Sequence, residues 1–275
     1  MTNGIAGIDH IIIAVRDLEA ARHSWLRLGF TPTPRGRHIG QGTANYCIMF
    51  GADYLELLGF VAHDEHARRL EAFLSRREGA MSVAFAPEQD AEATAVALAA
   101  SGLHPSAPRA LGRALELPEG AVTPRFSLLT LRPDETPALD CFICGHLTPE
   151  LVRRPEWLAH PNGVLGIAAV HLIADDPRSL APAYQRLFGD DRVTATIRGL
   201  EVDTGRNRLI FARPTMSGAD MPAPAIIALE LRIADRTSTA DYLQRAGIAF
   251  TTLPDGRIAV APAEANGTSL LLAEN

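Results

Sequence analysis

The feature that most constrains the fold is the stretch over residues 7–21, where an apolar run is followed by an aspartate and an alanine-rich amphipathic segment. This order predicts a buried strand, a turn and a helix with Asp17 as its N-terminal cap. The same order returns later, because Asp176 and Leu187 each stand 159 positions after Asp17 and Leu28. Repeats of roughly 50 residues indicate a supersecondary unit that buries one face against a neighbour.

Four copies of this unit can be read along the chain. In the first copy, a helix over 17–28 is followed by strands over 44–50 and 53–60, which gives a βαβββ order. A charged amphipathic helix over 63–77 connects it to the second copy. The four copies begin near residues 7, 80, 166 and 226. The segment over 146–164 has no clear period and three prolines, so it is predicted to join two domains.

Composition limits the classes of function. With a net charge of −6 the chain lacks the concentrated positive surface that nucleic acid requires. No apolar stretch approaches the roughly 20 residues of a membrane helix, and the first residues do not resemble a signal segment. We therefore expect a cytoplasmic protein with neither nucleic acid nor membrane as a partner. A redox role for Cys141 and Cys144 is disfavoured, because their side chains would point to opposite faces of a strand.

The opening strand resembles that of the vicinal oxygen chelate superfamily, which includes glyoxalases and extradiol dioxygenases, and more narrowly its glyoxalase-like domain branch. The residues that carry the resemblance are Gly7-Ile8-Asp9-His10, Gly36-Arg37-His38 with Gly42-Thr43-Ala44-Asn45, Tyr54-Leu55-Glu56-Leu57, His146-Leu147-Thr148-Pro149-Glu150 and His160-Pro161-Asn162-Gly163. The resemblance implies an α+β fold in which four βαβββ modules form two tandem half-barrel domains. We expect an N-terminal barrel over 1–147, a linker over 148–165 and a C-terminal barrel over 166–275.

The resemblance also implies a divalent metal held by the first and fourth strands of a module. His10 and Glu56 occupy these positions in the first module. A lone histidine in a strand is often only a core residue. A glutamate between Leu55 and Leu57 is harder to explain without a partner, because burying a carboxylate is costly.

The sequence does not decide which residue is the third metal ligand. The first strand of the second module offers only Ser82, whereas His146 follows its last strand. His146 would complete a site of two imidazoles and one carboxylate, which suits Fe(II), Mn(II) or a catalytic Zn(II). The competing interpretation is that His146 caps the turn that follows it.

Other residues of the first half are candidates for substrate chemistry. His38 lies in a predicted glycine-rich loop and is the candidate general acid or base. The candidate substrate-binding residues are Arg37, Asn45, Tyr54 and Trp157. The competing interpretation for Arg37 is a solvated position in a loop. Trp157 either seals the cavity or joins the two domains.

The second half has lost the metal pattern. Ala169 stands where the repeat would place His10, and His171 is two residues further along the strand. His171 and Glu230 are expected to meet across the second barrel, either as a buried pair with a structural role, which we favour, or as a degenerate site.

We therefore expect a divalent-metal-dependent isomerase or lyase that acts on a small oxygenated substrate chelating the metal, which is Zn, Fe, Mn or Ni. The alternatives are an Fe(II) extradiol-type dioxygenase and a non-catalytic protein that binds or sequesters a small molecule. A homodimer is also possible, since modules of this superfamily sometimes pair between chains.

Overall fold

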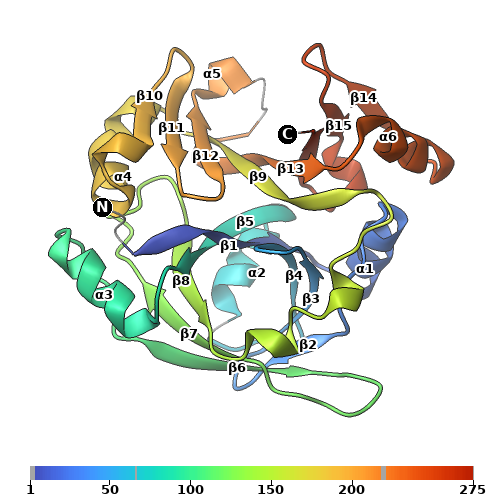
Figure 1. The fold of residues 1–275 in the computed structure, drawn as a ribbon, viewed down its shortest axis with the longest axis horizontal. Coiled ribbons are helices and arrows are strands. Elements are labelled where there is room, and N and C mark those ends of the chain that lie inside the picture. Colours follow the sequence, from blue (N-terminus) through green and yellow to red (C-terminus); the bar gives the residue numbers. More distant parts are fainter. Residues whose placement is uncertain (1–3, 66, 218–220, 275) are drawn as a thin grey trace.

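The computed structural model describes residues 4–65, 67–217 and 221–274. Two eight-stranded sheets, each built from two βαβββ modules, organise the chain (Figure 1). The predicted α+β class and the four modules are confirmed. The first sheet is built from β1 (Ile5–Ala14), α1 (Leu18–Arg27), β2 (Gly36–His38), β3 (Thr43–Met49), β4 (Tyr54–Phe60), β5 (Gly79–Pro87), α3 (Ala91–Ala100), β6 (Arg109–Leu115), β7 (Arg125–Thr130) and β8 (Cys141–His146).

The second sheet repeats the order with shorter strands. Its elements are β9 (Val164–Ile173), α4 (Ala181–Phe188), β10 (Val193–Ala195), β11 (Gly199–Asp203), β12 (Arg208–Ala212), β13 (Ala225–Ile233), α6 (Arg236–Arg245), β14 (Phe250–Thr252), β15 (Ile258–Val260) and β16 (Ser269–Ala273), with α5 (Pro214–Ser217) between its two modules. Short 3₁₀ turns lie at Pro149–Leu151, Pro155–Trp157, Pro177–Leu180, Asp190–Arg192 and Pro262–Glu264.

The first sheet closes into a barrel because β2 of the first module pairs with β6 of the second. The strand order around the barrel is β1-β4-β3-β2-β6-β7-β8-β5. Residues 36–38, predicted as loop, are thus a short strand. It pairs with the nearby β3 on one side and with the distant β6 on the other, and the local glycine-rich pattern did not show the pairing with β6.

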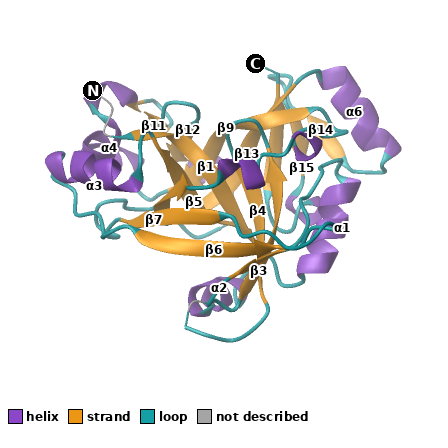
Figure 2. Cartoon of the chain, turned by 60° about the horizontal axis from the view of Figure 1, so that its bottom comes forward, coloured by secondary structure: helices purple, strands orange, loops and turns teal. Residues whose placement is uncertain are grey.

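The second sheet stays open in the described residues. Its order is β10-β11-β12-β9-β13-β16-β15-β14, so β10 and β14, the counterparts of β2 and β6, lie at opposite edges. Figure 2 shows α1, α3, α4 and α6 around the outside of the two sheets, and α2 (Arg68–Leu74) alone at one end of the barrel. The predicted helix over 63–77 is therefore shorter than expected.

The capping and packing of α1 follow from its sequence. The Asp17 side chain accepts a hydrogen bond from the backbone N–H of Ala20, as expected for an N-terminal cap. Leu18, Ala21 and Trp25 face inward from successive turns and are buried. The predicted helix over 17–28 is thereby confirmed to within a residue at each end.

The two sheets share one continuous hydrophobic core. Phe85 on β5 meets Phe188 on α4 edge to face, with ring centroids 5.3 Å apart. The segment between the halves is also fixed, because His160 donates a hydrogen bond to the carbonyl of Met49 and accepts one from the N–H of Thr31. None of the helices in the described residues has the length and apolar character that crossing a membrane requires.

A buried polar bridge joins the halves at Asn207, which precedes β12. Its Oδ1 accepts the N–H of Ile8 on β1 at 2.8 Å. Its Nδ2 donates to Asp53 Oδ2 at 3.0 Å and to the Ile167 carbonyl on β9 at 2.7 Å. Burial raises the pKa of Asp53, and the hydrogen bonds from Ile167 and Asn207 oppose that shift. One amide therefore satisfies buried groups of both sheets.

Replacing Asn207 by alanine is expected to lower the free energy of unfolding by about 2–4 kcal/mol, because several buried polar groups lose their partner. Chemical denaturation of Asn207→Ala against Gln244→Ala, an exposed position on α6, measures this difference. A loss no larger than that of the control would contradict the bridge.

Candidate functional site

The pairing of β1 with β4 brings His10 and Glu56 together inside the barrel. These strands run parallel, with His10 opposite Tyr54 and Ile12 opposite Glu56. His10 and Ile12 share a face of β1, so Glu56 becomes the diagonal neighbour of His10. The two side chains are almost fully buried, and His10 Nε2 lies 3.4 Å from Glu56 Oε2.

The other oxygen of Glu56 is held by the two neighbouring strands. Asn45 Nδ2 on β3 donates to Oε1 at 2.5 Å, and His38 Nε2 on β2 lies 3.7 Å from the same oxygen. Burial would raise the pKa of Glu56, but the charges of His10 and His38 and the Asn45 hydrogen bond outweigh it and lower the pKa. Glu56 is therefore a carboxylate at neutral pH.

His38 faces the carboxylate with a neutral imidazole. Burial lowers its pKa, and the nearby Glu56 charge opposes that shift only in part. Nδ1 shares a hydrogen bond of 2.8 Å with the Thr43 hydroxyl, and Asn45 Nδ2 lies 3.5 Å from Nε2. This arrangement favours the tautomer with a proton on Nδ1, which leaves Nε2 able to accept one.

Asp9 orients His10 from behind. Opposite β5 the register shifts between Ile8 and His10, so that Asp9 is the additional residue of a β-bulge. The bulge lets two consecutive residues be buried, and Asp9 Oδ2 accepts a hydrogen bond of 2.8 Å from His10 Nδ1. The sequence analysis did not identify Asp9, because strict alternation predicts that it faces away from His10.

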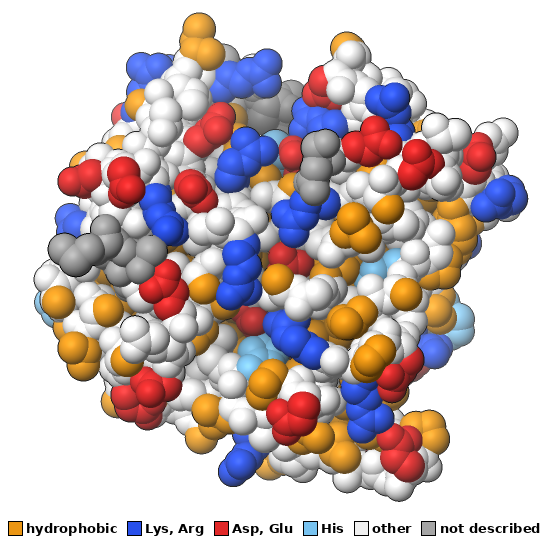
Figure 3. Space-filling view, viewed as in Figure 1, with side chains coloured by type: hydrophobic (Ala, Val, Ile, Leu, Met, Phe, Trp, Pro, Cys, Tyr) orange, Lys and Arg blue, Asp and Glu red, His pale blue; other side chains and the backbone are white. Residues whose placement is uncertain are grey.

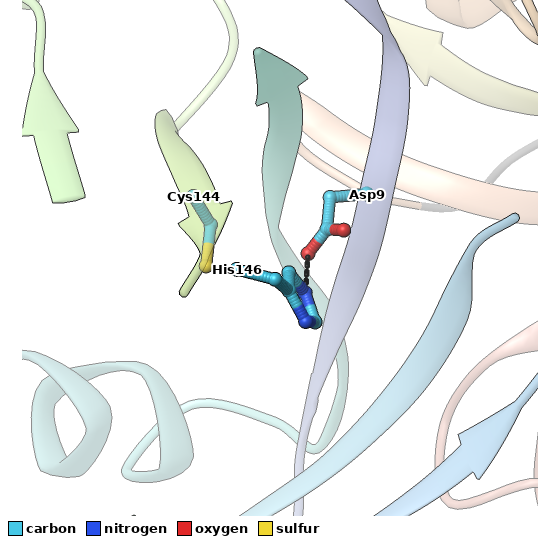
Figure 4. Close-up of side chains that lie close together, drawn as sticks. All are labelled: Asp9, Cys144 and His146. Atoms are coloured by element: carbon cyan, nitrogen blue, oxygen red, sulfur yellow. Dashed lines mark hydrogen bonds and ion pairs between the residues drawn. The ribbon is translucent and has the colours of Figure 1, made fainter. Parts of the chain in front are cut away.

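His146 lies on the other side of Asp9. Its Nε2 is 3.1 Å from Asp9 Oδ2, and Figure 4 shows Asp9 turned toward the imidazole, with Cys144 two residues earlier on β8. Tyr54 contacts both histidines: its ring stacks on the His10 ring at 4.4 Å and lies edge to face with the His146 ring at 5.9 Å. The structure thus brings His146 to Asp9, while the prediction grouped it with Glu56.

Asp9, Cys144 and His146 form a compact group whose potential ligand atoms all lie within 4.8 Å of one another. Burial, followed by the charge of Asp9, raises the pKa of Cys144 far above its ordinary value, so the thiol stays protonated. The pKa of Asp9 lies well below its usual range: burial would raise it, but the charges and hydrogen bonds of His146 and His10 prevail.

The group borders a hollow of about 610 Å³ at the end of the barrel, with Arg153 and Arg206. In Figure 3 acidic, basic and histidine side chains gather near the middle of this face.

The cavity next to Glu56 has a volume of about 240 Å³. Predicted residues His10, His38, Asn45, Tyr54 and Glu56 all line it. Arg37 does not line it in the described structure; it is exposed, because it alternates with His38 on β2. Trp157 is buried in a neighbouring apolar cluster with Leu115 and Leu117 rather than in the lining.

One cavity residue was not predicted. Arg113 on β6 is 3% exposed and lines the cavity together with Leu111 from the same face of the strand. The alternation of Leu111, Arg113 and Leu115 was the available signal, since it places an arginine among inward-facing apolar residues.

The second half holds a different arrangement. His171 Nε2 lies 3.0 Å from Glu230 Oε2, so the expected pair forms. Arg257 Nη1 donates to the same oxygen at 2.8 Å, and Arg208 lies 3.8 Å from the other. The hydrogen bond from His171, opposed by burial, lowers the pKa of Glu230. Its carboxylate is engaged by three cationic or imidazole groups.

Comparison with known proteins identifies the family and the fold. The family model described as glyoxalase-like domain matches residues 8–188. The structure of a hypothetical protein from Staphylococcus aureus superposes with a TM-score of 0.71 at 13% identity, covering 98% of this chain and 99% of that one. A mutant of 4-hydroxymandelate synthase from Streptomyces coelicolor gives 0.57 at 14% identity, covering 99% and 92%.

No curated protein matches the sequence at a significant level. The two solved structures share the fold at low identity, and the family model spans most of the chain, including every residue around Glu56. The chain therefore belongs to the glyoxalase-like domain family of the vicinal oxygen chelate superfamily.

Proposed function

We propose that the first barrel is the active site of a divalent-metal-dependent isomerase or lyase that acts on a small oxygenated substrate. The observation that carries this proposal is the approach of His10 Nε2 and His38 Nε2 to the two oxygens of one buried carboxylate, Glu56, inside a cavity. Both distances are too long for strong hydrogen bonds, so the Glu56 carboxylate can still accept a further ligand.

The donor groups fit a divalent ion held by His10 and Glu56. The separation of 3.4 Å between His10 Nε2 and Glu56 Oε2 matches the spacing of about 3.4 Å between two ligand atoms on a tetrahedral zinc ion. His10 Nδ1 is already bound to Asp9, which is the outer carboxylate that metal-bound histidines commonly have. Asn45 occupies the second oxygen of Glu56 and so fixes the first toward His10.

A bound ion would act as a Lewis acid on an oxygen of the substrate. The protein's own part is proton movement and orientation. His38 Nε2 is uncharged at neutral pH and faces the same carboxylate, so it can accept a proton from the substrate and return it at a different atom. Tyr54 holds the His10 ring by stacking against it.

One observation favours non-catalytic binding as a second candidate. Ser82, which lines the cavity from β5, donates its hydroxyl to the Asp140 carbonyl and is therefore engaged. The second module thus adds an apolar wall rather than a strong metal ligand at this position. A binding protein would retain ligand affinity when the metal is removed, whereas the proposed enzyme depends on the metal.

Replacing His10 by alanine or Glu56 by glutamine is expected to weaken divalent-metal affinity by more than about 100-fold, because each change removes a ligand. Asp9→Asn is expected to cost about 10–100-fold, as for an outer partner. Isothermal titration with Zn(II), Mn(II), Ni(II) and anaerobic Fe(II) measures these values, with the exposed positions His23→Ala and Glu150→Gln as controls.

The same titration tests the role of His38. His38→Ala should bind metal with nearly native affinity, since the proposal makes it the proton acceptor. An affinity loss as large as that of His10→Ala would assign it as a ligand instead. If the native protein binds none of these ions, the metalloenzyme proposal is wrong.

The pKa of His38 is expected to lie below the ordinary value of 6.5, because burial disfavours the imidazolium form. The Glu56 charge raises this pKa, so Glu56→Gln should lower it further. The neutral form that accepts a proton would then persist to lower pH. Titration of the histidine ring signals by NMR in chelator-treated protein measures both shifts, with exposed His23 as reference; a higher pKa in the variant would contradict this account.

A further inference from the structure

Arg113 is a buried cation that shares the cavity with the Glu56 carboxylate but makes no direct contact with it. Burial would lower the pKa of the guanidinium, and nearby groups, Glu56 among them, outweigh this and raise it. The Arg113 side chain is 3% exposed inside the barrel, and in the described part of the chain it forms no ion pair. Arginine is almost never fully buried in proteins unless it is paired. The absence of such a pair inside a cavity therefore points to a partner supplied from outside the chain.

The groups that do contact Arg113 are neutral. Nη1 donates to the sulfur of Cys47 at 2.7 Å, and the guanidinium lies 5.6 Å from the Phe126 ring centre. Burial raises the pKa of Cys47 to about 11, so this sulfur belongs to an uncharged thiol at neutral pH. Nε of Arg113 is buried and has no hydrogen-bond partner. The fork of donors is thus only partly used.

Gly36 provides the space that this arginine needs. A Cβ atom at residue 36 would lie 2.7 Å from Arg113 Cδ and 2.3 Å from Asn45 Oδ1. Asn45 Oδ1 is itself buried without a partner. Two buried polar atoms without a partner, Asn45 Oδ1 on β3 and Arg113 Nε on β6, therefore lie on either side of β2. Both residues line the wall of the cavity that also contains Glu56.

We propose that Arg113 binds a carboxylate of the substrate, so that the substrate class is a small organic acid. This inference rests on the proposed function of the same cavity. The carboxylate would take the planar guanidinium donors, as arginine–carboxylate pairs commonly do. Arg109 lies four residues before Arg113, on the same face of β6. It lines the same cavity and adds positive charge there.

The volume of the cavity restricts the acid to a small one. At about 240 Å³ it lies below the roughly 300–1,000 Å³ of sites that hold drug-sized ligands. Its remaining wall includes Leu128, Phe126 and Phe142, which suit an apolar body behind the carboxylate.

Benzoate and benzamide form a matched pair of probes that differ in charge but hardly in shape. The native protein is expected to bind benzoate at least about tenfold more tightly than benzamide, the effect of a hydrogen bond to a charged group. Isothermal titration measures both affinities in untreated and chelator-treated protein. The preference should persist after chelation, because the arginine does not need the metal. A failure of the metal proposal therefore leaves this test intact.

Arg113→Met should abolish the preference while leaving benzamide binding in place. Arg125→Met, on the outward face of β7, is the control and should keep it. Arg113→Lys retains the charge without the planar fork and serves if the methionine variant does not fold; its preference should be reduced.

Four results would overturn the assignment, and three of them concern the preference for benzoate. These are equal affinities of the native protein for the two probes, a preference lost on chelation, and a native preference in Arg113→Met. The fourth result is that the native protein does not bind benzoate even at about 10 mM, a concentration at which very weak binding would still be measured.

Discussion

The position of β1 between β4 and β5 determines the geometry of the whole first barrel. β1 runs parallel to β4 of its own module and antiparallel to β5 of the second module, so this one strand joins the two modules. The parallel register fixes Glu56 next to His10, and the register shift against β5 adds Asp9 behind it. A slip of one residue in either pairing would turn these polar groups toward the apolar side. The site therefore depends on backbone pairing before any side chain is considered.

The same order of elements produces a closed barrel in the first half of the chain and an open sheet in the second. In the first half, β2 and β6 pair and enclose a cavity around an imidazole–carboxylate pair. In the second half, the corresponding strands lie at opposite edges of an open sheet, and Glu230 is engaged by His171 and Arg257. Closure of the barrel buries His10 and Glu56, and burial strengthens the electrostatic interaction between them.

Much of the fold could be predicted from the sequence because the repeat is periodic in both apolar pattern and caps. His10 and Glu56 were found because each interrupts an apolar strand, and polar groups in such places need a partner. The side to which Arg37 points follows from the alternation along β2, but residues 36–38 were recognised as a strand only from their pairing with β3 and β6.

Other parts of the site depend on features that local pattern does not encode. The bulge at Asp9 breaks the alternation on which strand predictions rest, so its carboxylate was missed. His146 was grouped with Glu56 because each belongs to the last strand of its module; its hydrogen bond to Asp9, which also binds His10, is a tertiary contact. Arg113 differs from these two, because the alternation of Leu111, Arg113 and Leu115 does place it on the inward face of β6; the closure of β6 onto β2, which brings it beside Glu56, is a tertiary feature.

The bridge at Asn207 has a consequence for how this protein can be divided. The amide belongs to the second half, yet it satisfies the backbone of Ile8, two residues before His10 in the first. The strand that carries the candidate metal ligand is therefore held in part by the half that lacks the metal pattern. A fragment cut at the linker would leave Ile8 and Asp53 without their shared amide and would expose the apolar core common to both sheets. The second half therefore supports β1 of the first barrel, and the two pairs of modules have to be produced and engineered as one unit.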